Sequence, residues 1–244
     1  DKIAPTVKCK DIEVALDANG SGSYSEFDIN NGSTDNCSIG SGSTGYGFFQ
    51  VTCTDLGKTF PTTLTMQDPA GNQASCTANV TIVDKTAPTA TCQDVTLILD
   101  GSGIAATTAS AISASSTDNC GLANLSLDVS SFNCANVGKE NTVTLTASDL
   151  SGNSNTCTAK VTVVDQQAPT AICQDVSVRL DAAGNVTVPA SAVNNGSNDA
   201  CGIGALALDV SSFTRDNLGS NVVVLTVTDK NANTSTCSAT ITIL

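Results

Sequence analysis

Residues 142–164 read TVTLTASDLSGNSNTCTAKVTVV, two alternating runs on either side of a short polar turn. In Thr142–Ala147 and Thr158–Val164, apolar residues occupy every second position, which is the pattern of a half-buried β-strand. The turn Asp149–Asn153 begins with Asp and ends with Gly-Asn, which suits a tight loop with positive φ angles. The stretch therefore predicts a β-hairpin.

The hairpin belongs to a unit that occurs three times. Residues 1–6 (DKIAPT) return as residues 84–89 (DKTAPT) and as residues 165–170 (DQQAPT), and the cysteines that follow recur at matching offsets. Agreement at several offsets indicates tandem copies of one module. We expect an all-β fold with three tandem immunoglobulin-like β-sandwich modules in an elongated rod. The predicted modules are residues 1–83, 84–164 and 165–244.

Composition excludes several classes of function. Lys and Arg number 10 against 23 Asp and Glu, so the net charge of −13 argues against nucleic acid as a partner. The chain has no histidine and only 3% aromatic residues, which removes His-based catalysis and stacking platforms for sugars or bases. No stretch reaches the roughly 20 apolar residues of a membrane span. We expect no enzyme activity and no membrane insertion of this segment.

The 11 cysteines form no CxxC motif, so they read as structural disulfides in an oxidising, extracytoplasmic setting. We expect a monomeric segment of a larger secreted protein. Four cysteines in a module allow three connectivities, of which we favour first-to-last and second-to-third. In copy three, Arg215 replaces the third cysteine, which leaves Cys201 unpaired as a buried inert thiol or as half of an intermolecular bridge. The expected pairs are Cys9–Cys76, Cys37–Cys53, Cys92–Cys157, Cys120–Cys134 and Cys173–Cys237.

Three motifs carry a family resemblance over nearly the whole chain. Each copy contains D-x-x-A-P-T-x-x-C-x-D-[IV], then D-[NA]-C, then D-x-x-[GA]-N-x-x-x-C-[TS]-A. The copies resemble HYR-like (hyalin repeat) modules, and their tandem four-cysteine form is similar to the repeats of SprB-type adhesins of gliding bacteria. The resemblance implies cell-surface display at the outer membrane, type IX secretion, surface attachment and gliding motility. Copy three departs from the pattern at Arg215 and Ala232.

Three aspartates in each copy are expected to meet at one end of the module, because the entry linker, one connecting loop and the hairpin turn share an end in this topology. Ca²⁺ prefers several oxygen ligands, so these carboxylates predict a calcium site at each junction. The alternative is that each Asp caps its own turn through hydrogen bonds to the backbone. The sets are Asp1, Asp35 and Asp68; Asp84, Asp118 and Asp149; Asp165, Asp199 and Asp229.

The function we favour is a disulfide-braced stalk within a large secreted bacterial cell-surface adhesin. Its partner is then an extracellular surface, with a polysaccharide or protein ligand. Two alternatives remain open: the modules themselves bind carbohydrate or protein, or they form the accessory region of a secreted enzyme.

Overall fold

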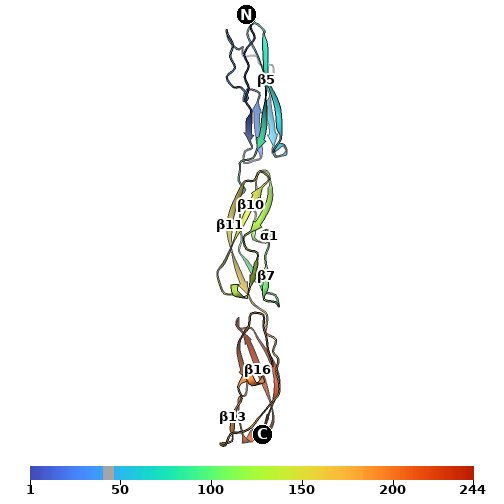
Figure 1. Cartoon of the computed structure of the whole chain (residues 1–244), viewed down its shortest axis with the longest axis vertical. Helices are drawn as coiled ribbons and strands as arrows, with labels where there is room; N and C mark the ends of the chain where they lie inside the picture. Colours follow the sequence, from blue (N-terminus) through green and yellow to red (C-terminus); the bar gives the residue numbers. More distant parts are fainter. Residues whose placement is uncertain (41–46) are drawn as a thin grey trace. The chain divides into compact units, whose positions relative to one another are not determined.

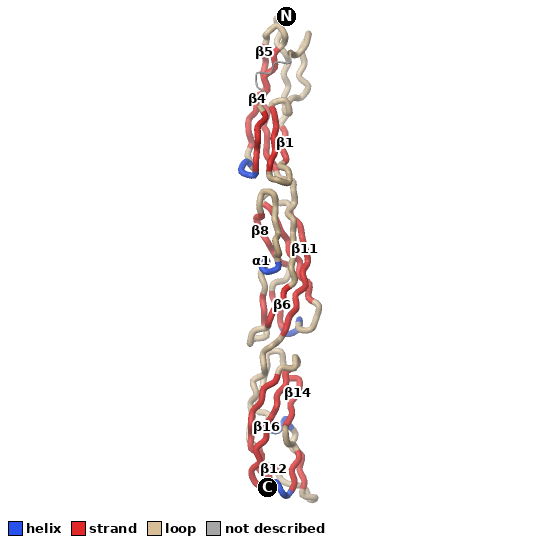
Figure 2. Tube along the Cα trace, turned by 180° about the vertical axis from the view of Figure 1, so that it is seen from behind, coloured by secondary structure: helices blue, strands red, loops and turns tan. Residues whose placement is uncertain are grey.

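A computed structural model describes residues 1–40 and 47–244. Strands dominate each module, and the few helices are single turns (Figures 1 and 2). No helix in the described residues is long and apolar enough to cross a membrane. We use module 1, 2 and 3 for residues 1–83, 84–164 and 165–244.

Contacts between Cα atoms divide the chain into two compact units. The first comprises Asp1–Cys92, Ser113–Ser126 and Leu145–Cys157, and the second comprises Gln93–Ile112, Leu127–Thr144 and Thr158–Leu244. The first unit holds module 1 and part of module 2, and the second unit holds the rest of module 2 and module 3. Each joint between consecutive modules therefore lies within a single unit.

In the first unit, two sheets enclose the core of module 1. Strand β1 pairs in parallel with β5, and β4 pairs antiparallel with β5, while β2 and β3 form a separate antiparallel pair (Figure 2 labels β1, β4 and β5). Tyr24 and Val51 from the smaller sheet share one core with Leu64 and Val80 from the larger sheet. The elements are β1 (Ile12–Ala15), β2 (Ser21–Ser25), β3 (Phe48–Thr52), the 3-10 turn η1 (Cys53–Asp55), β4 (Thr59–Gln67) and β5 (Gln73–Val83).

Module 2 has the same plan with two further elements, α1 and β8, compared with the described residues of module 1. Its main sheet has the order β6-β11-β10-β8, and β7 and β9 form a smaller pair. Its hairpin strands β10 and β11 are the ones predicted from residues 142–164, and they are neighbours in the sheet. The elements are β6 (Val95–Ile98), β7 (Ile104–Ala106), α1 (Ala109–Ile112), β8 (Leu122–Leu127), β9 (Ser131–Asn133), η2 (Cys134–Asn136), β10 (Asn141–Asp149) and β11 (Ser154–Val164).

Module 3, in the second unit, has the same plan. Its long hairpin strands β16 and β17 pair antiparallel, β12 runs parallel to β17, and β14 pairs with β16. Alternate residues of β16, including Val223, Leu225 and Val227, are fully buried, as the period of two requires. The elements are β12 (Val176–Val178), β13 (Asn185–Thr187), α2 (Ala190–Val193), β14 (Ile203–Leu208), β15 (Ser212–Thr214), η3 (Arg215–Asn217), β16 (Gly219–Asp229) and β17 (Thr234–Ile243).

This arrangement is an immunoglobulin-like sandwich: two sheets share one core, and a short first strand lies parallel to the last. The predicted all-β fold is confirmed. The hairpin turn also keeps its form in copy three, where Ala232 takes φ 71° at the place of Gly71 and Gly152. Asp229 N still donates to Asn233 O across that turn at 3.0 Å.

Candidate joint site and metal centre

A disulfide between the first and last cysteine closes each module. The first cysteine precedes the strand that lies parallel to the last strand, so it comes close to the cysteine near the start of that last strand. The Cα atoms of each bonded pair are 5.8 Å apart. These three module bridges agree with the predicted pairs: Cys9–Cys76, Cys92–Cys157 and Cys173–Cys237.

The remaining bridges cross the joints between modules. Cys53 of module 1 is bonded to Cys120 of module 2, and Cys134 of module 2 is bonded to Cys201 of module 3. The predicted bridges Cys37–Cys53 and Cys120–Cys134 are therefore wrong, and Cys201, which was predicted to be unpaired, is bonded. Among the described residues the free cysteine is Cys37, and it is exposed. We call the two crossing pairs joint bridges.

The length of the last strand explains this correction. Cys37 lies near the turn that precedes β5, because Gly40 N donates to Gln67 O at 2.9 Å. Cys53 lies at the other end of β5, where Gly57 N donates to Ile82 O at 3.0 Å. A strand of 11 residues spans more than about 30 Å, whereas bridged Cα atoms lie within about 7 Å. The third cysteine of one module therefore meets the second cysteine of the next.

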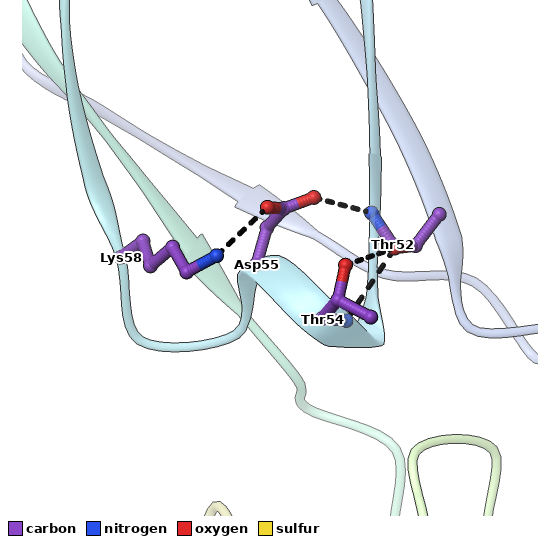
Figure 3. A network of polar contacts seen from close by, with 4 residues as sticks. All are labelled: Thr52, Thr54, Asp55 and Lys58. Carbon is purple, nitrogen blue, oxygen red and sulfur yellow. Dashed lines mark hydrogen bonds and ion pairs between the residues drawn. The ribbon is translucent and has the colours of Figure 1, made fainter.

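In each joint bridge, the third cysteine of one module begins a 3-10 turn, and we call this cysteine with its turn the turn half of the bridge. A capping box closes the turn (Figure 3). In η1, Thr54 N donates to Thr52 Oγ1 at 3.4 Å, and Thr52 N donates to Asp55 Oδ2 at 3.1 Å. Lys58 Nζ lies 3.3 Å from the other oxygen of Asp55. The box holds the backbone on both sides of Cys53. The same box occurs at η2 with Asn133 and Asn136, and at η3 with Thr214 and Asn217.

A glycine makes room for each turn half. Gly20 has φ +71°, and a Cβ built on it would collide with Cys53 Sγ. At Gly103 such a Cβ would lie 2.7 Å from Cys134 Sγ. Gly20 and Gly103 end the recurring segments LDANG and LDGSG, and Gly184 ends the third copy, LDAAG. Their recurrence signalled a shared turn, and nothing local signalled a close approach from a disulfide.

Hydrogen bonding from the Thr52 backbone lowers the pKa of Asp55 below its ordinary value; desolvation opposes this effect, and Lys58 adds to the lowering. Because the folded pKa is lowered, the ionised carboxylate stabilises the fold above its unfolded pKa. That stabilisation is lost as the pH falls through the lowered folded value.

We expect Asp55→Asn to reduce the acid sensitivity of the chain. The amide oxygen can still accept from Thr52 N but does not titrate. In the other modules, Asn136 and Asn217 accept from the backbone N of their own capping residues in this way. Thermal melts from pH 7 down to pH 2 should show a smaller fall in melting temperature than the wild type shows. Asn136→Asp is the matched control and should add acid sensitivity at η2. A wild-type fall in the Asp55→Asn chain would contradict this role.

The second cysteine of the other module lies in a loop, and we call this cysteine with its loop the loop half of the bridge. In the first joint bridge the loop half is the segment Asp118-Asn119-Cys120. Asp118 Oδ2 accepts from Cys120 N at 2.9 Å, which fixes the turn around the cysteine. Asn119 Nδ2 donates to Asp17 O of module 1 at 2.9 Å, so the loop is docked on the neighbouring module. Cys53 Sγ lies 3.3 Å from Asn119 O. The joint therefore combines a covalent bond with a polar contact.

The predicted aspartates meet at the same end as the loop cysteine in modules 1 and 2. One carboxylate oxygen from each member of a set lies within 4.8 Å of those from the other two members. Oxygen ligands of one Ca²⁺, each about 2.3–2.6 Å from the ion, are at most about 5 Å apart. The two groups are Asp1, Asp35 and Asp68, and Asp84, Asp118 and Asp149.

The turn-capping alternative holds for the hairpin aspartates. Asp68 Oδ1 accepts from Asn72 N at 2.8 Å, and its Oδ2 accepts from Asn72 Nδ2 at 2.7 Å. The Asn72 side chain makes the largest contribution to lowering the pKa of Asp68; desolvation opposes it and backbone donors add to it. Asp149 is held in the same way by Asn153. Capping and ion binding are compatible, because each carboxylate oxygen has more than one lone pair.

Two carboxylate oxygens of the second group lie buried with no hydrogen-bond partner, Asp84 Oδ2 and Asp118 Oδ1. Asp84 is only 5% exposed, and its other oxygen already accepts from Thr86 N at 2.9 Å and from Asn119 Nδ2 at 3.3 Å. Buried charge without a partner is costly, and three adjacent carboxylates repel one another. A divalent cation among these oxygens would relieve both effects.

The third set departs from the prediction. Asp165 and Asp199 lie within 4.8 Å of Cys201 Sγ, and Asp229 is outside that group. Cys201 Sγ belongs to a disulfide, so it offers no thiolate ligand. Lys230 packs here as well, because a Cβ on Gly202 would lie 3.2 Å from its Nζ. The second joint thus has fewer carboxylates than the first and a fixed positive charge nearby.

No family model and no curated protein matches this chain. Among solved structures, extracellular cadherin domains 1–4 of protocadherin gamma B7 match with 18% identity and a TM-score of 0.34, over 77% of this chain and 58% of that one. The chain thus spans little more than half of that structure. Mouse clustered PcdhgC3 EC1-3 matches with 15% identity and a TM-score of 0.32, over 75% of this chain and 77% of that one. The I-band fragment I67-I69 from titin matches with 10% identity and a TM-score of 0.39, over the full length of both.

The immunoglobulin-like fold and the disulfides together indicate the general type of function. Tandem immunoglobulin-like modules held by five disulfides fit an extracellular stalk or adhesion-type module.

Proposed function

We propose that this chain is a stalk segment of a large secreted bacterial surface adhesin, of the SprB type that its repeats resemble. In this role it is displayed at the cell surface after type IX secretion, serves attachment and gliding, and has no catalytic function. The observation that carries the proposal is the series of module bridges, Cys9–Cys76, Cys92–Cys157 and Cys173–Cys237, which shorten the covalent path through all three modules. The joint bridges Cys53–Cys120 and Cys134–Cys201 support it. They add a second covalent link to each module joint beside the backbone.

The module bridges give the chain a short covalent path for tension. Tension applied at the two ends passes through the disulfide Cys9–Cys76 and then along the backbone to Cys92. It continues through the disulfide Cys92–Cys157, along the backbone to Cys173 and through the disulfide Cys173–Cys237. Only the stretches Cys76–Cys92 and Cys157–Cys173, roughly 16 residues each, lie on that path. The rest of each module is shielded from the load. This property suits a stalk, which carries load along its length, and a module that only binds a ligand does not need it.

The experiment that tests the stalk function is single-molecule extension of the chain with its disulfides intact and reduced. If the module bridges carry the load of a stalk, the intact chain should resist lengthening, and the reduced chain should unravel because its load then passes through the whole backbone. Equal extensions in the two states would reject the proposal.

We further propose that Ca²⁺ binds Asp84, Asp118 and Asp149 at the first joint. The support is the pair of buried, unpartnered oxygens on Asp84 and Asp118, within a group where no ion pair to Lys or Arg is seen in the described part of the chain. Asp118 lies two residues before Cys120, so an ion there would stiffen the same loop that the joint bridge holds.

Ca²⁺ should raise the melting temperature of the chelator-treated protein, and titration calorimetry should show heat of binding. At 100-fold excess over Kd the expected gain is about 2.7 kcal/mol in the free energy of unfolding. Asp118→Asn should abolish most of the gain while its amide oxygen still accepts from Cys120 N. Asp100→Asn is the matched control, because exposed Asp100 caps a turn and belongs to none of the three groups. Equal melting temperatures in Ca²⁺ and in chelator would contradict Ca²⁺ binding at this joint.

A further inference from the structure

We infer that Cys37 is the loop half of a third joint bridge, whose turn half is the third cysteine of another module of this repeat. The inference follows from the pairing rule of the two observed joint bridges. In each, the third cysteine of one module bonds to the second cysteine of another, Cys53 to Cys120 and Cys134 to Cys201. Cys37 is the second cysteine of module 1, and the third cysteine of its own module is already bonded. The inference rests on this rule and not on the stalk function.

The loop around Cys37 already has the form of a bonded loop half. Asp35 Oδ2 accepts from Cys37 N at 3.0 Å and from Ser38 N at 3.1 Å. Asp118 and Asp199 hold the backbone N of Cys120 and Cys201 in the same way, at 2.9 and 2.7 Å.

The isolated backbone pair of β type that anchors the loop also recurs. Thr6 pairs antiparallel with Thr34, as Thr89 does with Thr117 in module 2. Asp35 Oδ1 is buried without a hydrogen-bond partner, as Asp118 Oδ1 is in the bonded loop. The thiol of Cys37 is exposed at the place where the other two modules carry a disulfide.

Module 3 shows what the partner must supply. Its η3 keeps the turn half intact except for the thiol: Thr214 and Asn217 close the capping box, and Arg215 begins the turn. Gly184 has φ +83°, and a Cβ on it would lie 3.0 Å from Arg215 Cγ, in the way Gly103 faces Cys134. Arg215 therefore occupies the turn-cysteine position, and replacing it by cysteine restores a complete turn half.

The test is the full chain with Arg215→Cys, incubated in a buffer of reduced and oxidised glutathione. Each new bridge joins two thiols, which release two protons and pass two electrons to glutathione disulfide, yielding two reduced glutathiones. Since one variant chain carries a turn half in module 3 and a loop half in module 1, it should assemble head to tail. We expect a ladder of reducible oligomers on non-reducing gels. Mass spectrometry should find the peptide with Cys37 joined to the peptide with position 215.

Asp216→Cys is the matched control, because it places an exposed thiol one residue further along the same turn. Arg215→Cys should form the ladder about tenfold faster than this control at equal concentration. Adding Cys37→Ser to Arg215→Cys should abolish the ladder. Far-ultraviolet circular dichroism and the melting temperature show that each variant folds. Equal rates in the two cysteine variants, or bridges that join only Cys37 to Cys37, would overturn the inference.

Discussion

When the chain is pulled from its two ends with every disulfide intact, the maximum extension between Cys9 and Cys237 should be about 13 nm, and we call this extension the limit. The limit arises because the load passes through three module bridges and about 32 residues of backbone. With all disulfides reduced, the same points are joined by roughly 228 residues, so the limit should rise to about 80 nm. Reduction is therefore expected to lengthen the chain about sixfold.

Force spectroscopy with tethers at the two termini measures both limits as contour lengths. The control is the chain in which Ser replaces the four joint cysteines Cys53, Cys120, Cys134 and Cys201. Its limit should stay near 13 nm, because the joint bridges lie off the shortest path. An intact chain that extends to several tens of nanometres would show that the module bridges do not carry the load.

Loss of one module bridge should transfer the load to the joint bridges. In Cys92→Ser/Cys157→Ser, the shortest path runs from Cys76 back to Cys53, across to Cys120, on to Cys134, across to Cys201 and back to Cys173. This detour contains about 65 residues, which sets the limit near 25 nm. Without the joint bridges the same double variant should reach about 35 nm, because the whole backbone from Cys76 to Cys173 would then extend.

The same instrument distinguishes the two limits, with the four-serine joint variant combined with Cys92→Ser/Cys157→Ser as the comparison. A double variant that already reaches 35 nm would mean that the joint bridges bear no load. A limit near 25 nm would identify them as a second covalent path that keeps the chain short after one module bridge breaks.

Local pattern predicted the hairpin strands, and the expected sandwich topology favoured the module bridges among three connectivities. Alternation in residues 142–164 identifies β10 and β11, because a strand with one buried face must place apolar residues at every second position. The pair Cys92–Cys157 follows from the position of each cysteine within its module, since the first and last strands of this sandwich are neighbours.

The aspartate groups were predictable in part. The expectation that the linker, loop and turn share an end holds for Asp84, Asp118 and Asp149, because the topology alone brings these segments together. Asp229 lies outside its group despite an identical offset from the last cysteine. Lys230, the residue after Asp229, packs against Gly202 beside this group, and no repeat pattern reveals the position of its side chain.

The sequence by itself determined the three copies and the strands of their hairpins, because both follow from residue patterns inside one module. Among three connectivities it favoured the bridge that closes each copy. Only the tertiary structure decided the partners of Cys53, Cys120, Cys134 and Cys201. Spacing is the same whether a cysteine pairs within its module or across a joint. The choice depends on which ends of the modules meet, and an 11-residue strand keeps the second and third cysteines of one module too far apart to bond.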